Sequence, residues 1–289
     1  MNGLAAAFGE LARGEAAVQL RMPTVSGGMR LNTMAAILPG KGYCGAKVYT
    51  ALGSRFSFVV LLFSLADGRM LATFDAGELT RLRSAAVSAL AARCLARGNS
   101  ANLTVFGTGA QAAGQVAALV QVLPIRTVRV VSRGKAVPFV ERVGKETGVA
   151  AMQVGAEEGV EAADVIVTAT RSYTPLFQGR LVREGCFIAA VGSAMPEAAE
   201  IDATTISRCS KVAVEALDHA RHEAGDLIQA ERAGAFSWNQ AITLGDLLLG
   251  KARGRESDSE ITLFESVGCA LEDVAVAALA YEKLQAPVA

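Results

Sequence analysis

The sequence lacks an excess of charge of either sign. Lysine plus arginine and aspartate plus glutamate number 28 each, and charged residues make up only 19% of the chain. A balanced chain carries no net field that would attract a polyanion or an anionic membrane. We therefore expect neither nucleic acid nor a membrane as a partner.

Cysteine, histidine and long apolar runs are also scarce. The five cysteines are scattered without a C-x-x-C pair, which argues against a disulfide framework or a zinc site and for a reducing, cytoplasmic location. The two histidines, His219 and His222, have no evident third ligand, so we expect no metal and place them on a solvated helix face. No apolar run reaches the roughly 18 residues of a membrane helix, and the first residues lack the layout of a signal peptide.

What the chain does have is apolar sequence in short runs. Hydrophobic residues make up 52% of its 289 residues, enough for one large or two medium domains with buried cores. From about residue 102 onward, apolar runs alternate with helix-favouring stretches, which is typical of βα units around a parallel sheet. The expected strands are 103–106, 127–131, 151–154, 164–168, 187–191 and 211–215.

The residues before 102 have a different pattern. Segments 45–50, 56–65 and 69–74 read as antiparallel strands, with Ala66-Asp67-Gly68-Arg69 as a hairpin turn. A long helix is expected over 80–97, and an amphipathic helix over 269–284. This part of the chain is therefore of the α+β class.

Residues 103–114 contain a glycine motif in a specific context. An apolar run ends in Gly107-x-Gly109-x-x-Ala112 and continues directly into alanine-rich, helix-favouring sequence. Strand, tight turn and helix N-terminus in that order form a dinucleotide fingerprint, in which the free N–H groups of the helix receive the pyrophosphate. The motif predicts a Rossmann-type nucleotide-binding domain.

The end of the second expected strand indicates which dinucleotide is bound. NAD sites usually have an acid there, which accepts hydrogen bonds from the ribose 2′-OH. Here the strand is followed by Ser132, Arg133 and Lys135, which suit a 2′-phosphate through charge-assisted hydrogen bonds. We expect NADP(H) to be favoured over NAD(H); the alternative is that the two cations merely solvate a turn.

Five short motifs identify a resemblance. They are GAKVY at 45–49, GELTRLRSAA at 77–86, GTGAQ at 107–111, EAGDL at 223–227 and FESVGCALED at 264–273. In this order they resemble the ornithine cyclodeaminase/mu-crystallin family over roughly residues 21 to 284. The resemblance implies a homodimer with a substrate and dimerisation domain over 1–100, to which 268–289 return, and a nucleotide domain over 101–267.

The resemblance also implies the site residues. Arg21, Lys47 and Arg83 stand where the family binds the substrate carboxylate, and a small anionic amino or imino acid does need fixed cations. Without the family, Lys47 and Arg83 read more readily as solvated surface cations than as functional residues. The same comparison adds Val267 as a substrate contact. It implies the cofactor contacts Ser57, Arg83, Gly107, Gly109, Ala110, Gln111, Ser132, Arg133, Lys135, Thr168, Val191, Gly192 and Ser266.

One departure from the family pattern bears on the reaction. The cyclodeaminases have an acid and a lysine where this chain has Ala194 and Ala198. Losing a general acid/base costs roughly 10²- to 10⁴-fold, and Glu197 or Glu200 could take over the role only after a shift of the segment. Residues 193–196 and 261–265 resemble the family's cyclic-imine reductases instead.

The expected activity is therefore reduction of Δ1-pyrroline-2-carboxylate to L-proline with NAD(P)H, catalysed by Lys47 and Arg83. Lys47, or a water held near it, is the expected proton donor. Open alternatives are ornithine cyclodeaminase activity, alanine dehydrogenase activity, and a non-catalytic, crystallin-like protein that binds NADP.

Overall fold

The chain divides into two units in the computed structural model, which describes residues 1–53, 55–192 and 194–286. Unit 1 comprises Met1–Arg83 together with Gly268–Ala289, and unit 2 comprises Ser84–Val267. The boundary between Arg83 and Ser84 falls within one helix, α2 (Gly77–Leu95). Each unit has its own sheet.

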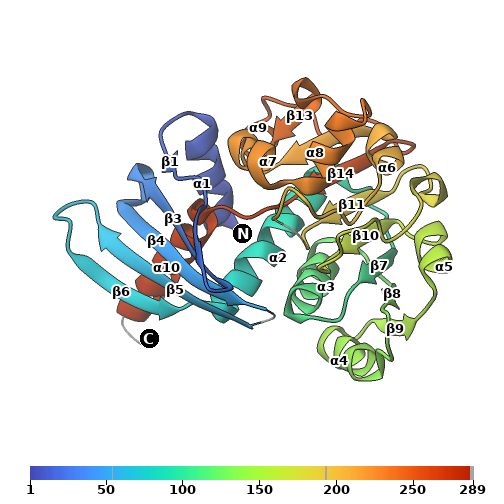
Figure 1. The fold of residues 1–289 in the computed structure, drawn as a ribbon, viewed down its shortest axis with the longest axis horizontal. Coiled ribbons are helices and arrows are strands. Elements are labelled where there is room, and N and C mark those ends of the chain that lie inside the picture. The colour runs from blue at the N-terminus through green and yellow to red at the C-terminus, as the bar shows by residue number, and fades with distance from the viewer. Residues whose placement is uncertain (54, 193, 287–289) are drawn as a thin grey trace. The chain divides into compact units, whose positions relative to one another are not determined.

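Unit 1 is an antiparallel sheet with a helix across one face. Its strands are β1 (Ala17–Val18), β2 (Met22–Ser26), β3 (Met29–Leu38), β4 (Tyr43–Leu52), β5 (Arg55–Ser64) and β6 (Met70–Asp75). They lie in the order β1-β3-β4-β5-β6, with β2 also paired to β3. Helix α10 (Ala270–Gln285) packs on β3, β4 and β5 and on α1 (Asn2–Ala12), as Figure 1 shows. The expected strands and both helices are present; β1, β2 and β3 were not predicted.

The two faces of this sheet are both apolar. Toward α10, Met34, Val60 and Leu62 are at most 1% exposed, as expected for alternate residues on one face of a strand. On the other face, Ile37 is 45% and Val59 38% exposed. Within the described part of unit 1, no helix covers this second face.

Unit 2 is a parallel sheet flanked by helices. Its strands are β7 (Asn102–Phe106), β8 (Thr127–Val131), β9 (Ala150–Gln153), β10 (Val165–Thr168), β11 (Phe187–Ala190), β12 (Cys209–Val214), β13 (Ala241–Thr243) and β14 (Ile261–Glu265). The helices are α3 (Ala110–Val122), α4 (Val137–Thr147), α5 (Ala156–Glu161), α6 (Ala203–Ser207), α7 (Leu217–Glu223), α8 (Gly225–Arg232) and α9 (Leu244–Leu248). Short 3₁₀ turns among the described residues lie at Pro39–Lys41 in unit 1 and at Gly179–Leu181 and Trp238–Gln240 in unit 2.

The parallel sheet confirms the α/β prediction but is larger than expected. Its order is β13-β12-β14-β11-β10-β7-β8-β9, and every adjacent pair is parallel. All six predicted strands are present. β13 and β14 were missed, and β14 lies between β11 and β12 although it follows both in the chain. Strand β14 is buried along its whole length, so it has no alternating pattern of apolar and polar residues.

The histidine prediction holds for one of the two residues. His222 is exposed and its Nδ1 lies 2.6 Å from the carbonyl oxygen of Asp218. His219 is only 3% exposed, so its placement on a solvated face was wrong. Among the described residues there is no group of three potential metal ligands, and no helix there is long and apolar enough to cross a bilayer.

Candidate functional site

Lys47 is the most deeply placed of the predicted cations. It lies on β4 between Met34 of β3 and Val60 of β5, on the face toward α10, and is 2% exposed. Its Nζ donates to Thr80 Oγ1 at 2.7 Å and to Asp273 Oδ1 at 2.9 Å. The Thr80 hydroxyl donates in turn to a backbone carbonyl, so Thr80 acts on Lys47 only as an acceptor. The lysine is therefore oriented from two sides.

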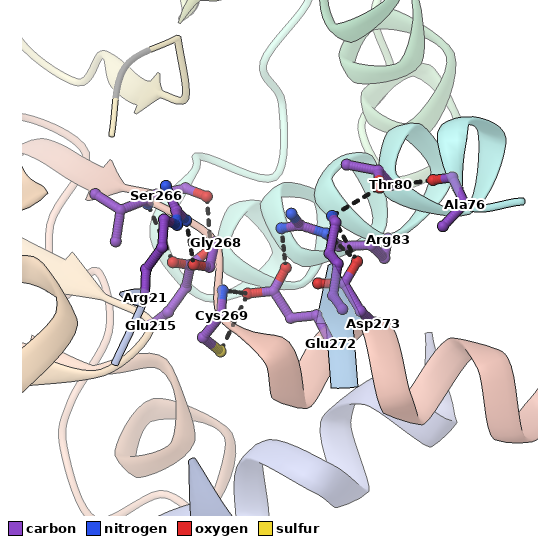
Figure 2. Close-up of polar contacts among 12 residues, drawn as sticks. Arg21, Ala76, Thr80, Arg83, Glu215, Ser266, Gly268, Cys269, Glu272 and Asp273 are labelled. Carbon is purple, nitrogen blue, oxygen red and sulfur yellow. Dashed lines mark hydrogen bonds and ion pairs between the residues drawn. The ribbon is translucent and has the colours of Figure 1, made fainter. Parts of the chain in front are cut away.

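Arg83 lies one turn beyond Thr80 on α2 and joins the same acids. Its Nη1 donates to Glu272 Oε2 at 2.5 Å, and its Nε donates to Asp273 Oδ1 at 3.2 Å. Glu272 and Asp273 belong to the first turn of α10 and are both 0% exposed. Figure 2 shows Arg83 meeting the two carboxylates. Two cations and two anions thus form one buried, balanced cluster, which we call the charge cluster (Lys47, Arg83, Glu272 and Asp273).

Arg21, the third predicted cation, lies directly before β2 in unit 1. Its Nη2 donates to the carbonyl oxygen of Gly268 at 3.1 Å. Arg21 Cζ and Lys47 Nζ lie 5.9 and 5.8 Å from the centre of the Tyr49 ring. Gly268 has φ 72°, and a Cβ there would lie 2.6 Å from Arg83 Nη1. The three cations predicted from the sequence are therefore brought together within unit 1.

The electrostatics of Lys47 follow from its surroundings. Burial lowers the pKa of the ammonium from 10.5 to about 8, and the Asp273 carboxylate opposes this while Arg83 adds to it. The Phe58 ring also faces Nζ, at 4.9 Å from its centre. An ammonium has three N–H donors, and within the described chain Thr80 and Asp273 accept from two of them. One donor of Lys47 is left for a ligand.

The glycine turn of unit 2 has the geometry that a dinucleotide requires. Gly107 has φ 109°, and a Cβ there would lie 2.6 Å from the carbonyl oxygen of Ala169, so only glycine fits. Gly109 is the N-cap of α3, and a Cβ built on it meets nothing within 4 Å. Ala110 and Gln111 begin α3, whose first turn contains no acid. This open helix N-terminus fits a pyrophosphate.

Three of the predicted cofactor residues follow β8: one is hydrogen-bonded within the turn and two are exposed. Ser132 Oγ donates to the carbonyl oxygen of Gly134 at 2.7 Å and so helps to hold the turn. Arg133 and Lys135 are exposed, and neither forms an ion pair within the described chain. Both cations therefore remain able to meet an anion.

The other predicted cofactor contacts lie at the carboxyl ends of the strands, apart from one. Thr168 ends β10, Val191 and Gly192 follow β11, and Ser266 and Val267 follow β14. Such crevices at the carboxyl ends of parallel strands are where doubly wound sheets bind nucleotides. Ser57 lies instead on β5 of unit 1, paired with Thr50 and exposed.

A cluster of buried acids supports these strand ends and was not predicted. Glu200 Oε1 accepts from the Thr170 backbone N–H at 2.7 Å, and its Oε2 accepts from that of Gly192 at 2.8 Å. Asp226 Oδ1 accepts from the backbone N–H groups of Glu200 and Ile201, each at 2.7 Å. We call Glu200, Asp226 and the adjoining Glu265 the acid cluster.

Burial favours the protonated forms of the acids in this cluster. Burial raises the pKa of Glu200 to about 7 and raises that of Asp226. The pKa of Glu265 is raised well above 4.5, first by burial and then by the neighbouring Asp226 and Glu200. Like charges in one buried site cannot all be ionised. Nearby, Glu215 accepts from Ser266 Oγ at 2.5 Å and from the Val267 backbone N–H at 3.1 Å, fixing the loop after β14.

In the described part of the segment after β11, the two positions compared with the cyclodeaminases are alanines. Ala194 is partly buried against the apolar core of unit 2, and Ala198 is 1% exposed. Glu200 is 0% exposed, with both carboxylate oxygens engaged, whereas Glu197 is exposed. Ser193, the first residue of the segment aligned with the imine reductases, lies outside the described residues.

Residues 1–287 match the model of the ornithine cyclodeaminase/mu-crystallin family. A Δ1-pyrroline-2-carboxylate reductase of Bacillus cereus is 36% identical over 261 residues, which are 86% of this chain and 80% of that protein.

Two solved structures are similar over almost the whole chain. A probable ornithine cyclodeaminase from Bordetella pertussis Tohama I has a TM-score of 0.95 and 43% identity, covering 98% of this chain and 91% of that one. The Thermococcus litoralis Δ1-pyrroline-2-carboxylate reductase, solved with NADH and L-proline, has a TM-score of 0.93 and 30% identity at the same coverages.

Proposed function

The chain belongs to the ornithine cyclodeaminase/mu-crystallin family, and on that premise we propose that it is an NAD(P)H-dependent reductase of small cyclic imino acids. Its substrate is Δ1-pyrroline-2-carboxylate and its product L-proline. The observation that carries the proposal is the convergence of Arg21, Lys47 and Arg83 in unit 1, combined with alanine at 194 where the cyclodeaminases have an acid. The names of the Bacillus cereus and Thermococcus litoralis relatives support the same substrate.

In this proposal the cations bind the carboxylate of the substrate. Lys47 contributes the N–H donor that neither Thr80 nor Asp273 uses. Arg83 offers a planar guanidinium that suits a carboxylate bidentately. Arg21 adds a third charge beside Gly268, and Val267 adds an apolar contact. Charge-assisted hydrogen bonds are about twice as strong as neutral ones. Such bonds suit a small ligand that has few other groups for the protein to bind.

The cofactor is a nicotinamide dinucleotide bound at the Gly107 turn of unit 2. Gly107, Gly109, Ala110 and Gln111 would hold the pyrophosphate, since the turn leaves open space before the helix N-terminus. When bound, the nicotinamide supplies a hydride to the carbon of the C=N bond. Thr168, Val191, Gly192 and Ser266 are the residues of unit 2 proposed to contact its nicotinamide half. Ser57 and Arg83 are proposed as cofactor contacts on the family resemblance.

We further propose that NADPH is preferred over NADH. The support is local: Arg133 and Lys135 are exposed without an ion-pair partner in the described chain, and Ser132 lies beside them. The Thermococcus litoralis relative was solved with NADH, so the preference rests on this chain's own three residues.

The proton for the imine nitrogen comes from Lys47, through the same N–H that contacts the carboxylate, since the carboxylate and the C=N group share one carbon of the substrate. Its ammonium gives a proton to nitrogen, so that a C=N–H⁺ group forms and the positive charge moves from Nζ to the substrate. Hydride then adds to carbon, the C=N bond becomes C–N, and the amine of proline results. Lys47 regains its proton from solvent. A lysine whose pKa is about 8 can both hold and release this proton near neutral pH.

The partner that we propose is a second copy of the chain. The sheet of unit 1 has an apolar face that no helix of that unit covers in the described residues, and Ile37 and Val59 are more than one third exposed there. Contiguous exposed apolar surface marks interaction sites. Unit 1 would then combine substrate binding with dimerisation. A cytoplasmic location remains a proposal that rests on the scattered cysteines.

The decisive experiment is a substrate panel. We expect NADPH oxidation with Δ1-pyrroline-2-carboxylate and its six-membered analogue, and little with pyruvate plus ammonia. Ornithine with NAD⁺ should release no ammonia, because Ala194 provides no acid. Ornithine belongs in the panel because the Bordetella pertussis relative is described as a probable cyclodeaminase. Steady ammonia release from ornithine, or no turnover of either imine, would overturn the proposal; binding of NADPH without any turnover would point to a crystallin-like protein.

A further inference from the structure

Asp273 occupies a special place in the charge cluster. It lies in the first turn of α10 and is 0% exposed. A single oxygen, Oδ1, accepts from Lys47 Nζ at 2.9 Å and from Arg83 Nε at 3.2 Å. The lysine belongs to β4 and the arginine to α2, so this oxygen ties together a strand and a helix that are separate in the chain.

We propose that Asp273 is a positioning residue of the substrate site: it fixes the spacing between the Lys47 ammonium and the Arg83 guanidinium, and it keeps Lys47 charged while buried. The catalytic consequence of this inference rests on the function proposed above. Asp273 itself does not contact substrate in the proposal. It acts through the two cations that do.

Several groups face Lys47 Nζ and determine whether its ammonium stays charged. These are Asp273 and Glu272 of α10, Thr80 and Arg83 of α2, and the rings of Phe58 and Tyr49. A buried ammonium is strongly disfavoured unless an anion compensates it. Arg83 repels the ammonium, and Glu272 is a weaker influence than Asp273. Without the Asp273 charge, Lys47 would lose its main compensation.

Asp273 Oδ1 also sets the spacing between Lys47 and Arg83. Both nitrogens lie within 3.2 Å of one carboxylate oxygen, so their separation is held by that atom. A substrate carboxylate that bridges the same two side chains needs this separation. Positioning within a fraction of an ångström matters for turnover, since a shift of about 1 Å can cost 10²-fold.

Glu272 has a different task, although it is the neighbouring residue. It contacts Arg83 but not Lys47, and its other oxygen accepts from the Cys269 backbone N–H at 3.1 Å, which caps α10. Glu272→Gln should therefore disturb Arg83 and the helix start. It should leave the titration of Lys47 much closer to that of the unchanged protein than Asp273→Asn does.

The test uses the full-length protein and two independent measurements. The chain has seven lysines, so ¹³C-lysine labelling gives few ¹³Cε signals, and Lys47→Met identifies the one from Lys47. Its titration needs no substrate. The second measurement is kcat/KM for Δ1-pyrroline-2-carboxylate against pH. Glu282→Gln, an exposed acid on the same helix, is the control that should change neither.

We expect Asp273→Asn to lower the Lys47 pKa by at least about one unit. The ammonium then survives only at lower pH, so the alkaline decline of kcat/KM moves downward by a similar amount. At neutral pH kcat/KM should fall by about tenfold or more. Asp273→Glu separates charge from spacing, because it keeps the anion and moves it by one methylene. It should leave the Lys47 titration near that of the unchanged protein and raise KM.

Several outcomes would overturn the inference. An unchanged Lys47 titration in Asp273→Asn contradicts the charge role, and an unchanged KM in Asp273→Glu contradicts the spacing role. If Asp273→Asn does not fold, Asp273→Glu and the titration of Lys47 in the unchanged protein still decide it. If no imine is reduced by the unchanged protein, the proposed function fails, yet the NMR titration continues to test Asp273.

Discussion

The two units solve the problem of buried charge in opposite ways. In unit 1 the charge cluster pairs Lys47 and Arg83 with Glu272 and Asp273, so that burial is offset by opposite charge. In unit 2 the acid cluster brings carboxyl groups together, and burial raises their pKa values so that the protonated forms are favoured. Both arrangements avoid an uncompensated buried ion.

The difference separates recognition from support. Cations that remain charged in a buried site can bind an anionic ligand, and under the proposed function Lys47 offers an N–H donor to the substrate. In the acid cluster, Glu200 instead uses both oxygens to accept hydrogen bonds from the backbone at Thr170 and Gly192. We therefore propose that the charge cluster serves the chemistry and that the acid cluster shapes the strand ends.

The largest effect should come from removing a charge from the charge cluster. Lys47→Met keeps most of the side-chain volume but has no proton to give and no charge to offer. We expect kcat/KM for the cyclic imine to fall between about 10²- and 10⁴-fold, on the scale of a lost general acid. NADPH affinity, measured by fluorescence titration, should change little. Unchanged turnover of every cyclic imine would remove Lys47 from the site.

The acid cluster should instead affect how the free energy of unfolding depends on pH. A carboxyl whose pKa is raised on folding stabilises the protein fully below about pH 4.5 and loses that contribution as the pH rises through its folded pKa. For Glu200, a change from 4.5 to about 7 amounts to on the order of 3 kcal/mol. The free energy of unfolding should therefore fall between pH 5 and 7.5.

Glu265→Gln sharpens this comparison. The amide can still donate to Asp226, and it removes one like charge from the acid cluster, so the fall in stability over this pH range should be at least about 1 kcal/mol smaller. Urea unfolding at pH 5 and 7.5 measures it. The range stops below pH 8 because Lys47 titrates there with the opposite sign. An equal fall in both proteins would show that Glu265 is not part of a coupled cluster.

Sequence patterns indicated the cations of the charge cluster but not the roles of the acids in either cluster. Lys47 and Arg83 were found because motifs of the family surround them, and the Rossmann-type sheet was found because its strands alternate with helices. Glu272 and Asp273 were part of a quoted motif but read as ordinary acids at a helix start, where the helix dipole favours them. Glu200, Asp226 and Glu265 come from three separate segments, and no local pattern indicates that they meet.

An exposed cation provides a third case beside the two buried clusters. Arg133 has no ion-pair partner within the described chain, so its charge is available to the 2′-phosphate of the NADPH that we propose as cofactor. We expect Arg133→Asp to weaken NADPH binding about 10- to 100-fold, the scale of a lost charged hydrogen bond with repulsion added, and to affect NADH much less. Comparing the two dissociation constants tests this. Equal losses would show that Arg133 does not contact the 2′-phosphate.

The smallest expected effect on kcat/KM tests whether geometry, apart from charge, matters in the charge cluster. Gly268 and Gly42 have nearly the same backbone conformation, with φ 72° and 74°. Alanine at either position should cost a similar 1–2 kcal/mol or so of stability, because both need the left-handed region. They differ in what the new methyl group meets. At Gly42 there is open space within 4 Å, whereas at Gly268 the methyl group would lie 2.6 Å from Arg83 Nη1.

The guanidinium is the far end of a flexible side chain, so it can move aside without unfolding the protein. We therefore expect Gly268→Ala and Gly42→Ala to unfold at similar urea concentrations but to differ in activity. Gly268→Ala should lower kcat/KM about tenfold through a displaced Arg83, mainly by raising KM, and Gly42→Ala should leave it nearly unchanged. Equal activity in two equally stable variants would mean that the position of Arg83 does not limit substrate binding, and that charge alone explains the cluster.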